Sequence, residues 1–132
     1  MKSIQTTKHT RREFSVLHRT RSAQAATMTL APGATSSTPR RPSAALPRRG
    51  KPGSSHSSSS NEHGWAEQWL YVVSGHGRAK VGKRTVKLEP GTLLVIAKHE
   101  PHEIKSGARS RLVTVNLYVP AAYDSHGEPL RG

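Results

Sequence analysis

Residues 61–77 read NEHGWAEQWLYVVSGHG and residues 88–104 read LEPGTLLVIAKHEPHEI. Both stretches contain short runs of aromatic, leucine and β-branched side chains, which are enriched in β-strands. Turn residues punctuate these runs, since Gly75 follows the first run and Pro90-Gly91 precedes the second. The pattern predicts strands and tight turns in both stretches.

Runs of the same kind extend the strand pattern over most of the chain. We expect strands at residues 14–18, 25–30, 69–73, 78–81, 84–88, 93–97, 102–105 and 111–119. Gly82-Lys83 suits a two-residue hairpin whose first turn residue has a positive φ angle. No segment keeps a sustained helical repeat of apolar residues. About eight short strands form a jelly roll, so the sequence predicts an all-β fold, a single jelly-roll barrel.

Residues 36–60 differ in composition from the rest of the 132-residue chain. They are rich in Ser, Pro, Gly and Arg, and such a segment cannot bury enough apolar surface to offset ~1–2 kcal/mol of backbone entropy per residue. We therefore expect one domain at residues 14–123, interrupted by a disordered insertion at residues 36–60. A disordered tail at residues 1–13 and a C-terminal tail at residues 124–132 would flank it.

The formal net charge of +13 is concentrated in the first half of the chain. Residues 1–60 hold eleven Lys or Arg and one acid, whereas residues 61–132 hold ten Lys or Arg and seven acids. Arginine pairs in the first half could contact a polyanion by counterion release, so a polyanion or nucleic-acid adaptor stays one alternative. No aromatic residue is interleaved with these arginines and no helix is expected, which argues against nucleic acid as the main partner.

The chain has no cysteine, which excludes disulfides, thiolate metal sites and cysteine nucleophiles. No apolar run is long enough for a membrane-spanning helix, so no membrane partner is expected. The string TRREFS at residues 10–15 is similar to a twin-arginine export signal, but His18, Arg19 and Arg21 occupy the place of the apolar stretch that such a signal needs. We therefore expect a cytoplasmic protein.

The two quoted stretches resemble the two motifs of the cupin family, and the resemblance covers roughly residues 14–123. In the family's first motif two histidines one residue apart are followed by a glutamate and then a glycine, and the second motif supplies a third histidine. On this chain Asn61 and His63 fall on the paired histidines, Gln68 on the glutamate, Gly75 on the glycine and His102 on the third histidine. The resemblance implies a small cupin jelly roll.

Cupins hold a metal ion with three imidazoles and one carboxylate, a set that suits iron, manganese, nickel, copper or zinc. Asn61 and His63 are at positions i and i+2, so on a strand they would face the same side. Two of the four family ligands are replaced here by neutral amides, which compensate the charge of a divalent cation poorly. The resemblance thus makes Asn61, His63, Gln68 and His102 candidate ligands of a divalent transition metal that is weakly bound or absent.

The same four residues would line a ligand pocket inside the barrel. We favour a small cupin that binds a small polar ligand there, with imidazoles and amides as hydrogen-bonding groups. A metal-dependent enzyme of the dioxygenase or isomerase type stays an alternative, and the sequence leaves open whether the protein is an enzyme. Glu62, Glu67 and Glu103 each lie one residue from an inward position and should face outward, which argues against a general base in the pocket.

The strand at residues 69–73 is apolar on both faces, because Trp69 and Tyr71 alternate with Leu70. The early strands or a second copy of the chain would have to cover its outer face, and we expect a homodimer. His76, His99 and His126 lie beside turn residues and are expected in loops.

Overall fold

The computed structural model describes residues 1–36 and 65–130. In these ranges it contains one short 3-10 helix and eight strands: η1 (Thr6–His9), β1 (Phe14–Arg19), β2 (Gln24–Leu30), β3 (Glu67–Ser74), β4 (Gly77–Val81), β5 (Arg84–Leu88), β6 (Leu93–Ile96), β7 (His102–Ser106) and β8 (Leu112–Val119). All eight expected strands are confirmed, with small shifts at their ends.

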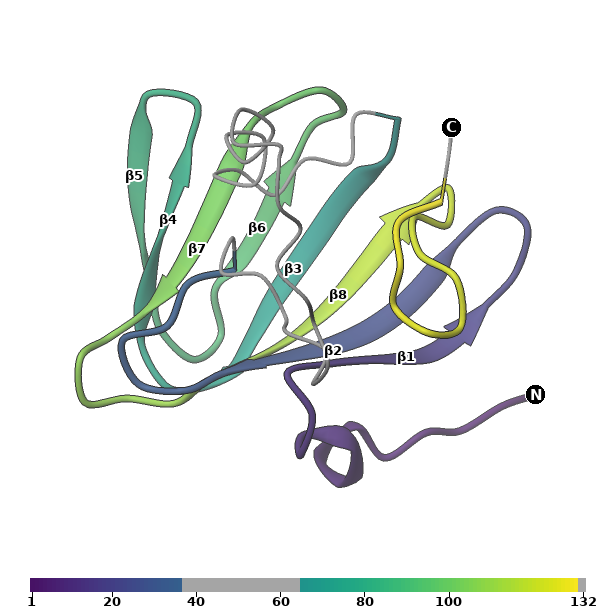
Figure 1. Ribbon diagram of the computed structural model, residues 1–132, viewed down its shortest axis with the longest axis horizontal. Coiled ribbons are helices and arrows are strands. Elements are labelled where there is room, and N and C mark those ends of the chain that lie inside the picture. The colour runs from purple at the N-terminus through teal and green to yellow at the C-terminus, as the bar shows by residue number, and fades with distance from the viewer. Residues whose placement is uncertain (37–64, 131–132) are drawn as a thin grey trace, which may run out of the picture.

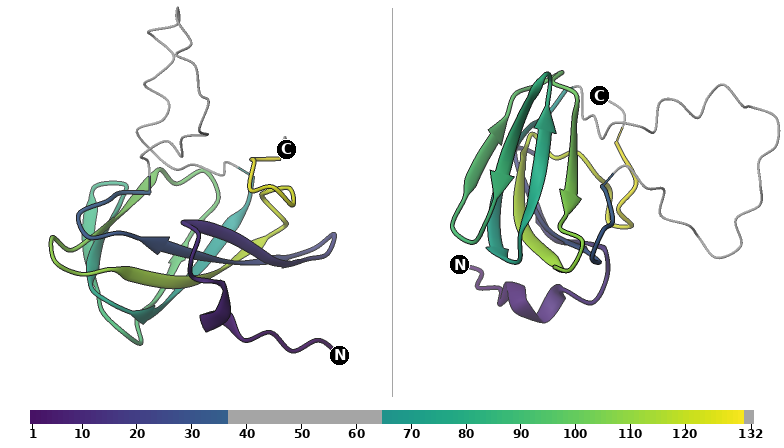
Figure 2. Two further views of the ribbon diagram at one scale, coloured as in Figure 1. Left: turned by 60° about the horizontal axis from the view of Figure 1, so that its bottom comes forward. Right: turned by 90° about the vertical axis from the view of Figure 1, so that its left-hand side faces the viewer.

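The strands form two antiparallel sheets that enclose a common interior (Figures 1 and 2). One sheet has the order β1-β2-β8-β3-β6 and the other the order β5-β4-β7. β8 lies in the middle of the larger sheet, where it pairs with β2 on one side and β3 on the other. The jelly-roll barrel predicted from the sequence is therefore confirmed.

Two turns have the backbone conformation that their glycines predict. Gly82, between β4 and β5, has a φ angle of 60°, and Val81 and Arg84 pair directly across it. Gly91 has a φ angle of 94°, a region that side-chain-bearing residues rarely adopt. Gly91 lies in the turn that leads from β5, in the three-stranded sheet, to β6, in the five-stranded sheet.

The core lies between the two sheets, where alternate side chains of strands such as β3 and β4 point inward. Its main cluster combines residues of both sheets: Met28, Leu30, Leu70, Val72, Ala79, Leu88, Ile104 and Leu112. Phe14, Tyr118 and Tyr123 form a second cluster, with the Phe14 and Tyr123 ring centroids 4.8 Å apart and those of Tyr118 and Tyr123 5.1 Å apart.

A buried glutamine fastens the C-terminal segment to β2. Gln24 donates from Nε2 to the carbonyl oxygen of Tyr123 at 2.7 Å. Its Oε1 accepts from the backbone N–H groups of Ala122, at 3.1 Å, and Tyr123, at 2.9 Å. Both ends of this buried amide are therefore hydrogen-bonded, as burial requires.

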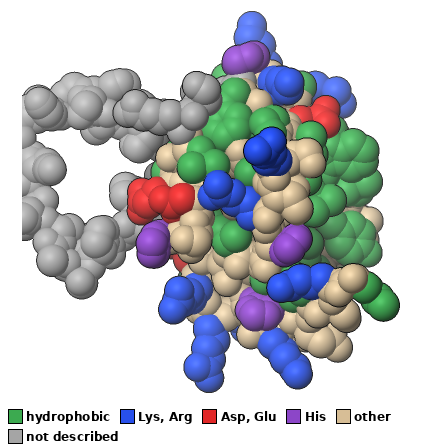
Figure 3. Space-filling view, turned by 90° about the vertical axis from the view of Figure 1, so that its right-hand side faces the viewer, with side chains coloured by type: hydrophobic (Ala, Val, Ile, Leu, Met, Phe, Trp, Pro, Cys, Tyr) green, Lys and Arg blue, Asp and Glu red, His purple; other side chains and the backbone are tan. Residues whose placement is uncertain are grey.

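Large apolar side chains are also exposed, and most of them share the outer face of the five-stranded sheet. On this face the exposed residues are Trp69, Tyr71, Leu93, Val95, Leu117 and Val119. Figure 3 presents the molecule from the side of the β1-β2 turn and shows hydrophobic side chains gathered along one margin of that view. The expectation that β3 is apolar on both faces is confirmed, since Leu70 between Trp69 and Tyr71 is fully buried.

The expected insertion at residues 36–60 lies outside the described residues except for Ser36. Ser36 donates its backbone N–H to the carbonyl of Ile104 at 2.7 Å, and its Oγ accepts from the N–H of Ile104 at 2.9 Å. The second described range begins at Trp65, two residues before β3. Among the described residues, no helix is long and apolar enough to cross a membrane.

Candidate functional site

Gln68 points into the barrel from the start of β3, and its side chain is 2% exposed. Its Nε2 donates to Oδ1 of Asn116 at 2.9 Å. Its Oε1 is buried and has no hydrogen-bond partner among the described residues. A buried carboxamide oxygen in this state is an acceptor available to a ligand.

His102 points into the barrel from the first position of β7 and is 3% exposed. Its Nδ1 lies 3.0 Å from the backbone carbonyl of Glu100. A carbonyl oxygen can only accept, so Nδ1 carries the proton in this contact. In the neutral ring the lone pair is then on Nε2, which is the atom that a ligand donor or a metal ion would use.

Gln68 and His102 belong to different sheets but lie at the same end of the barrel. Gln68 pairs in register with Ile96, the last residue of β6. The connection that follows Ile96 leads directly to His102 at the start of β7. Both side chains are buried, Gln68 on β3 and His102 on β7.

Asn61 and His63 lie outside the described residues, so their predicted convergence with Gln68 and His102 stays a prediction. Trp65 and Ala66 lead from that part of the chain into β3. Ser36, at the other end of the undescribed segment, pairs with Ile104, two residues from His102 on the same strand.

Asn116 and Thr114 extend the polar part of the interior and were not predicted from the sequence. Both are fully buried on β8, and Nδ2 of Asn116 donates to Oγ1 of Thr114 at 3.0 Å. The sequence of β8, LVTVNLYV, could have indicated them, because Thr114 and Asn116 are its two polar residues and are two positions apart. Polar residues on the face of a strand that is otherwise buried indicate an interior hydrogen-bond network.

The neighbouring acids face outward, as predicted. Oε1 of Glu67 accepts from the indole N–H of Trp69 at 2.9 Å on the outer face of β3. Glu103 alternates with the buried residues His102 and Ile104 and pairs in register with Lys80. Neither glutamate therefore adds a carboxylate to the interior end that holds Gln68.

The described residues do not by themselves make a metal centre. Among them, no three His, Cys, Asp or Glu side chains lie close enough to hold an ion together. Gln68 and His102 offer one amide oxygen and one imidazole nitrogen, whereas transition-metal sites in proteins use three or four protein ligands. A divalent ion would need additional donors from the chain outside the described ranges, and the two described donors bring no negative charge.

Gly75 occupies a position that requires glycine. It has a φ angle of 87°, and a Cβ there would collide with the backbone of Arg111 and Leu112. This agrees with its alignment to the glycine of the family motif. His76, His99 and His126 lie in loops, as expected from the sequence.

The comparisons with known proteins agree with this architecture. Residues 50–118, more than half of the chain, match the family model described as a cupin domain. No curated protein sequence matches the chain.

Several solved structures are similar in fold. A double-stranded β-helix protein from Klebsiella pneumoniae is 13% identical with a TM-score of 0.69, covering 91% of this chain and 90% of its own. A protein from Bacillus halodurans is 15% identical with a TM-score of 0.68, covering 95% and 80%. KdgF from a Halomonas species is 18% identical with a TM-score of 0.60, covering 82% and 77%. With the family match, the two-sheet barrel and the required glycine, the chain belongs to the cupin family.

Proposed function

We propose that this cupin binds a small, uncharged polar ligand at the end of the barrel that contains Gln68 and His102. Asn61 and His63 complete the pocket in this proposal, as the motif alignment predicts. The observation that carries it is the buried Oε1 of Gln68, which has no hydrogen-bond partner in the described part of the chain.

A comparison with the other buried glutamine shows why this atom is informative. Gln24 uses Nε2 and Oε1 in three hydrogen bonds to the backbone of the C-terminal segment. Gln68 uses only Nε2, although it is equally buried. A buried polar atom without a partner costs about 1–3 kcal/mol, and a ligand that donates a hydrogen bond would recover much of that energy.

The chemistry of the two described groups defines the class of ligand. Oε1 of Gln68 is an acceptor. In the neutral form of His102, Nε2 is an acceptor as well, because Nδ1 then donates to the carbonyl of Glu100. Two acceptors at one end of an apolar interior favour a ligand with hydroxyl groups over an anion. A neutral polyol or sugar fits this requirement.

Weak binding of a divalent transition metal is the second candidate, and with it a metal-dependent enzyme. The tautomer of His102 favours it, since the lone pair of Nε2 faces away from the hydrogen bond to Glu100. The neutral donor set and the outward orientation of Glu67 and Glu103 argue for low affinity and against a carboxylate base.

Saturation-transfer NMR on the full chain with glycerol, D-glucose and myo-inositol tests the first candidate. We expect saturation transfer to at least one of these probes and its loss in Gln68→Met and His102→Phe. Glu67→Gln is the matched control, because it changes the adjacent residue of β3 on the outer face. Absence of transfer to all three probes, or transfer that persists in Gln68→Met, would refute the proposal.

Elemental analysis of the purified protein separates the second candidate from the first. Near-stoichiometric iron, manganese, nickel, copper or zinc that is lost in both His63→Ala and His102→Ala would favour the metal enzyme. No bound metal after incubation with each of these ions would remove that candidate.

A further inference from the structure

Three basic side chains lie side by side across the outer face of the β5-β4-β7 sheet. We call such a row of residues, paired in register across neighbouring strands, a rung. Arg78 of β4 lies directly opposite Lys87 of β5 on one side and Lys105 of β7 on the other. All three are exposed, whereas Ala79, the next residue of β4, is buried. Side chains directly opposite each other have Cβ atoms ~4.5–5.5 Å apart, so three positive charges emerge within roughly 10 Å.

The neighbouring rung on the same face does not place positive charges opposite each other. There Lys80 lies between the hydroxyl of Thr85 and the carboxylate of Glu103. That arrangement is the one that sheet stability favours, because like charges directly opposite each other destabilise a sheet. The rung of Arg78 departs from this rule, and departures from local stability rules concentrate at functional positions.

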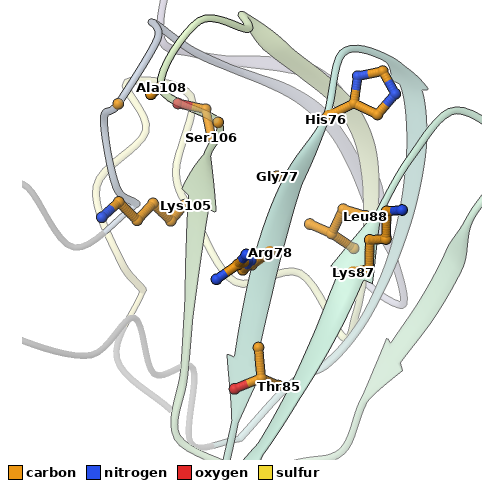
Figure 4. A pocket seen from close by; sticks show the side chains of 11 residues that line it. His76, Gly77, Arg78, Thr85, Lys87, Leu88, Lys105, Ser106 and Ala108 are labelled. Carbon is orange, nitrogen blue, oxygen red and sulfur yellow. The ribbon is translucent and has the colours of Figure 1, made fainter.

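The rung also borders a cavity of about 770 Å³. Arg78, Lys87 and Lys105 line it together with His76 and Thr85, and no Asp or Glu is among the described residues that line it. Figure 4 shows Arg78 on the middle strand, with Lys105 and Lys87 on either side and His76 towards one end. The lysine side chains extend to either side of Arg78, and their flexible stems allow both ammonium groups to fold towards a shared ligand.

We propose that this cavity is a binding site for a small, multiply charged oxyanion such as a phosphate ester or a diphosphate. The guanidinium of Arg78 supplies the planar pair of donors that suits a phosphate, and the two lysines add point charges. Thr85 and His76 provide further hydrogen-bonding groups at the margin. The three basic side chains lie on the outer face of the sheet, and neither Gln68 nor His102 lines the cavity.

Titration of the ¹⁵N-labelled full chain with inorganic pyrophosphate tests this proposal. We expect amide shift changes centred on β4, β5 and β7, and about tenfold weaker binding in Arg78→Gln, the effect of losing one charge-assisted interaction. Lys80→Gln removes the same charge from the same face of β4, one rung away, and serves as the matched control. It should change the affinity by about twofold or less through the general field.

Three outcomes would overturn the proposal. The first is no pyrophosphate binding at low ionic strength. The second is equal weakening by Lys80→Gln and Arg78→Gln, which would indicate a general charge effect. The third is a set of shift changes confined to other parts of the chain. If pyrophosphate fails to bind while a single-stranded RNA binds and is weakened equally by both variants, the face is instead a nonspecific polyanion contact.

Discussion

Gln68 of β3 donates a hydrogen bond to Asn116 of β8 at 2.9 Å, although the two residues are not direct partners in the sheet. The register instead pairs Gln68 with Tyr118 and Leu70 with Asn116, so the contact is diagonal. Asn116 in turn donates a hydrogen bond from Nδ2 to Oγ1 of Thr114. The orientation of the Gln68 amide, and with it the direction of its Oε1, is therefore set by β8.

Replacing Asn116 should reveal this dependence in the stability of the fold. Asn116→Leu leaves Nε2 of Gln68 buried without its acceptor, which should lower the free energy of unfolding by about 1–3 kcal/mol. The double variant Gln68→Leu/Asn116→Leu removes both partners and should recover part of that loss. Urea unfolding of the parent, Asn116→Leu, Gln68→Leu and the double variant measures the coupling. Additive losses would show that the two side chains do not interact.

Restoring the family's residues should create a stronger metal site. Gln68→Glu with Asn61→His adds a carboxylate and a third imidazole to His63 and His102, so zinc and manganese should bind at least tenfold more tightly than to the parent. Calorimetric titration with each ion measures the change. Glu67→Asp, which alters a carboxylate on the outer face of the same strand, should leave the affinity unchanged. Equal affinities of the double variant and the parent would contradict the motif alignment.

The apolar outer face of the five-stranded sheet should mediate self-association. Two rungs are apolar across three strands: Val95, Trp69 and Leu117 in one, and Leu93, Tyr71 and Val115 in the other. These exposed side chains would supply part of the ~800 Å² that each partner buries in a standard interface. We propose that a second copy of the chain covers this face in a two-fold arrangement, because two apolar sheet faces can stack on each other.

Sedimentation velocity over a range of concentrations tests the dimer. The parent should sediment as a dimer, and the charges introduced by Leu93→Lys/Val95→Lys should convert it to a folded monomer. Thr85→Lys, on the outer face of the other sheet, is the control and should remain dimeric. A parent that stays monomeric at every concentration would refute this interface.

Asp124 should make a small, pH-dependent contribution to stability. The hydrogen bond that its carboxylate accepts from the backbone N–H of Glu128 lowers its pKa, assisted by that from His126. Because the pKa is lower in the folded state, the contribution is present above the unfolded value near ~4 and is lost as the pH falls through the folded value. Asp124→Asn should therefore flatten the fall in melting temperature as the pH is lowered below the unfolded value near ~4. An unchanged pH profile in the variant would contradict this.

The sequence predicts the local features of this fold well, because strands, turns and inward positions depend on neighbouring residues. The motif alignment places Gln68 inward, alternation then places Glu67 outward, and glycine chemistry predicts the conformation of Gly82. The pairing of Gln68 with Asn116 depends on how β3 and β8 align across a separation of 48 residues. Arg78 likewise faces Lys87 and Lys105 only because of the register in which β4 pairs with β5 and β7. A shift of that register by one residue would place other residues opposite Arg78.

The hydrogen bonds between the side chain of Gln24 and the backbone of Ala122 and Tyr123 affect the order in which the chain can fold during synthesis. β2 leaves the ribosome early, but its sheet partner β8 and the backbone groups that satisfy its buried amide are translated more than 80 residues later. Until then the nascent chain must hold an apolar hairpin of β1 and β2 with an unfinished edge, which is the kind of surface that chaperones recognise. The N-terminal hairpin can therefore complete its sheet and its buried hydrogen bonds only after β8 and the segment at Ala122 and Tyr123 have been synthesised.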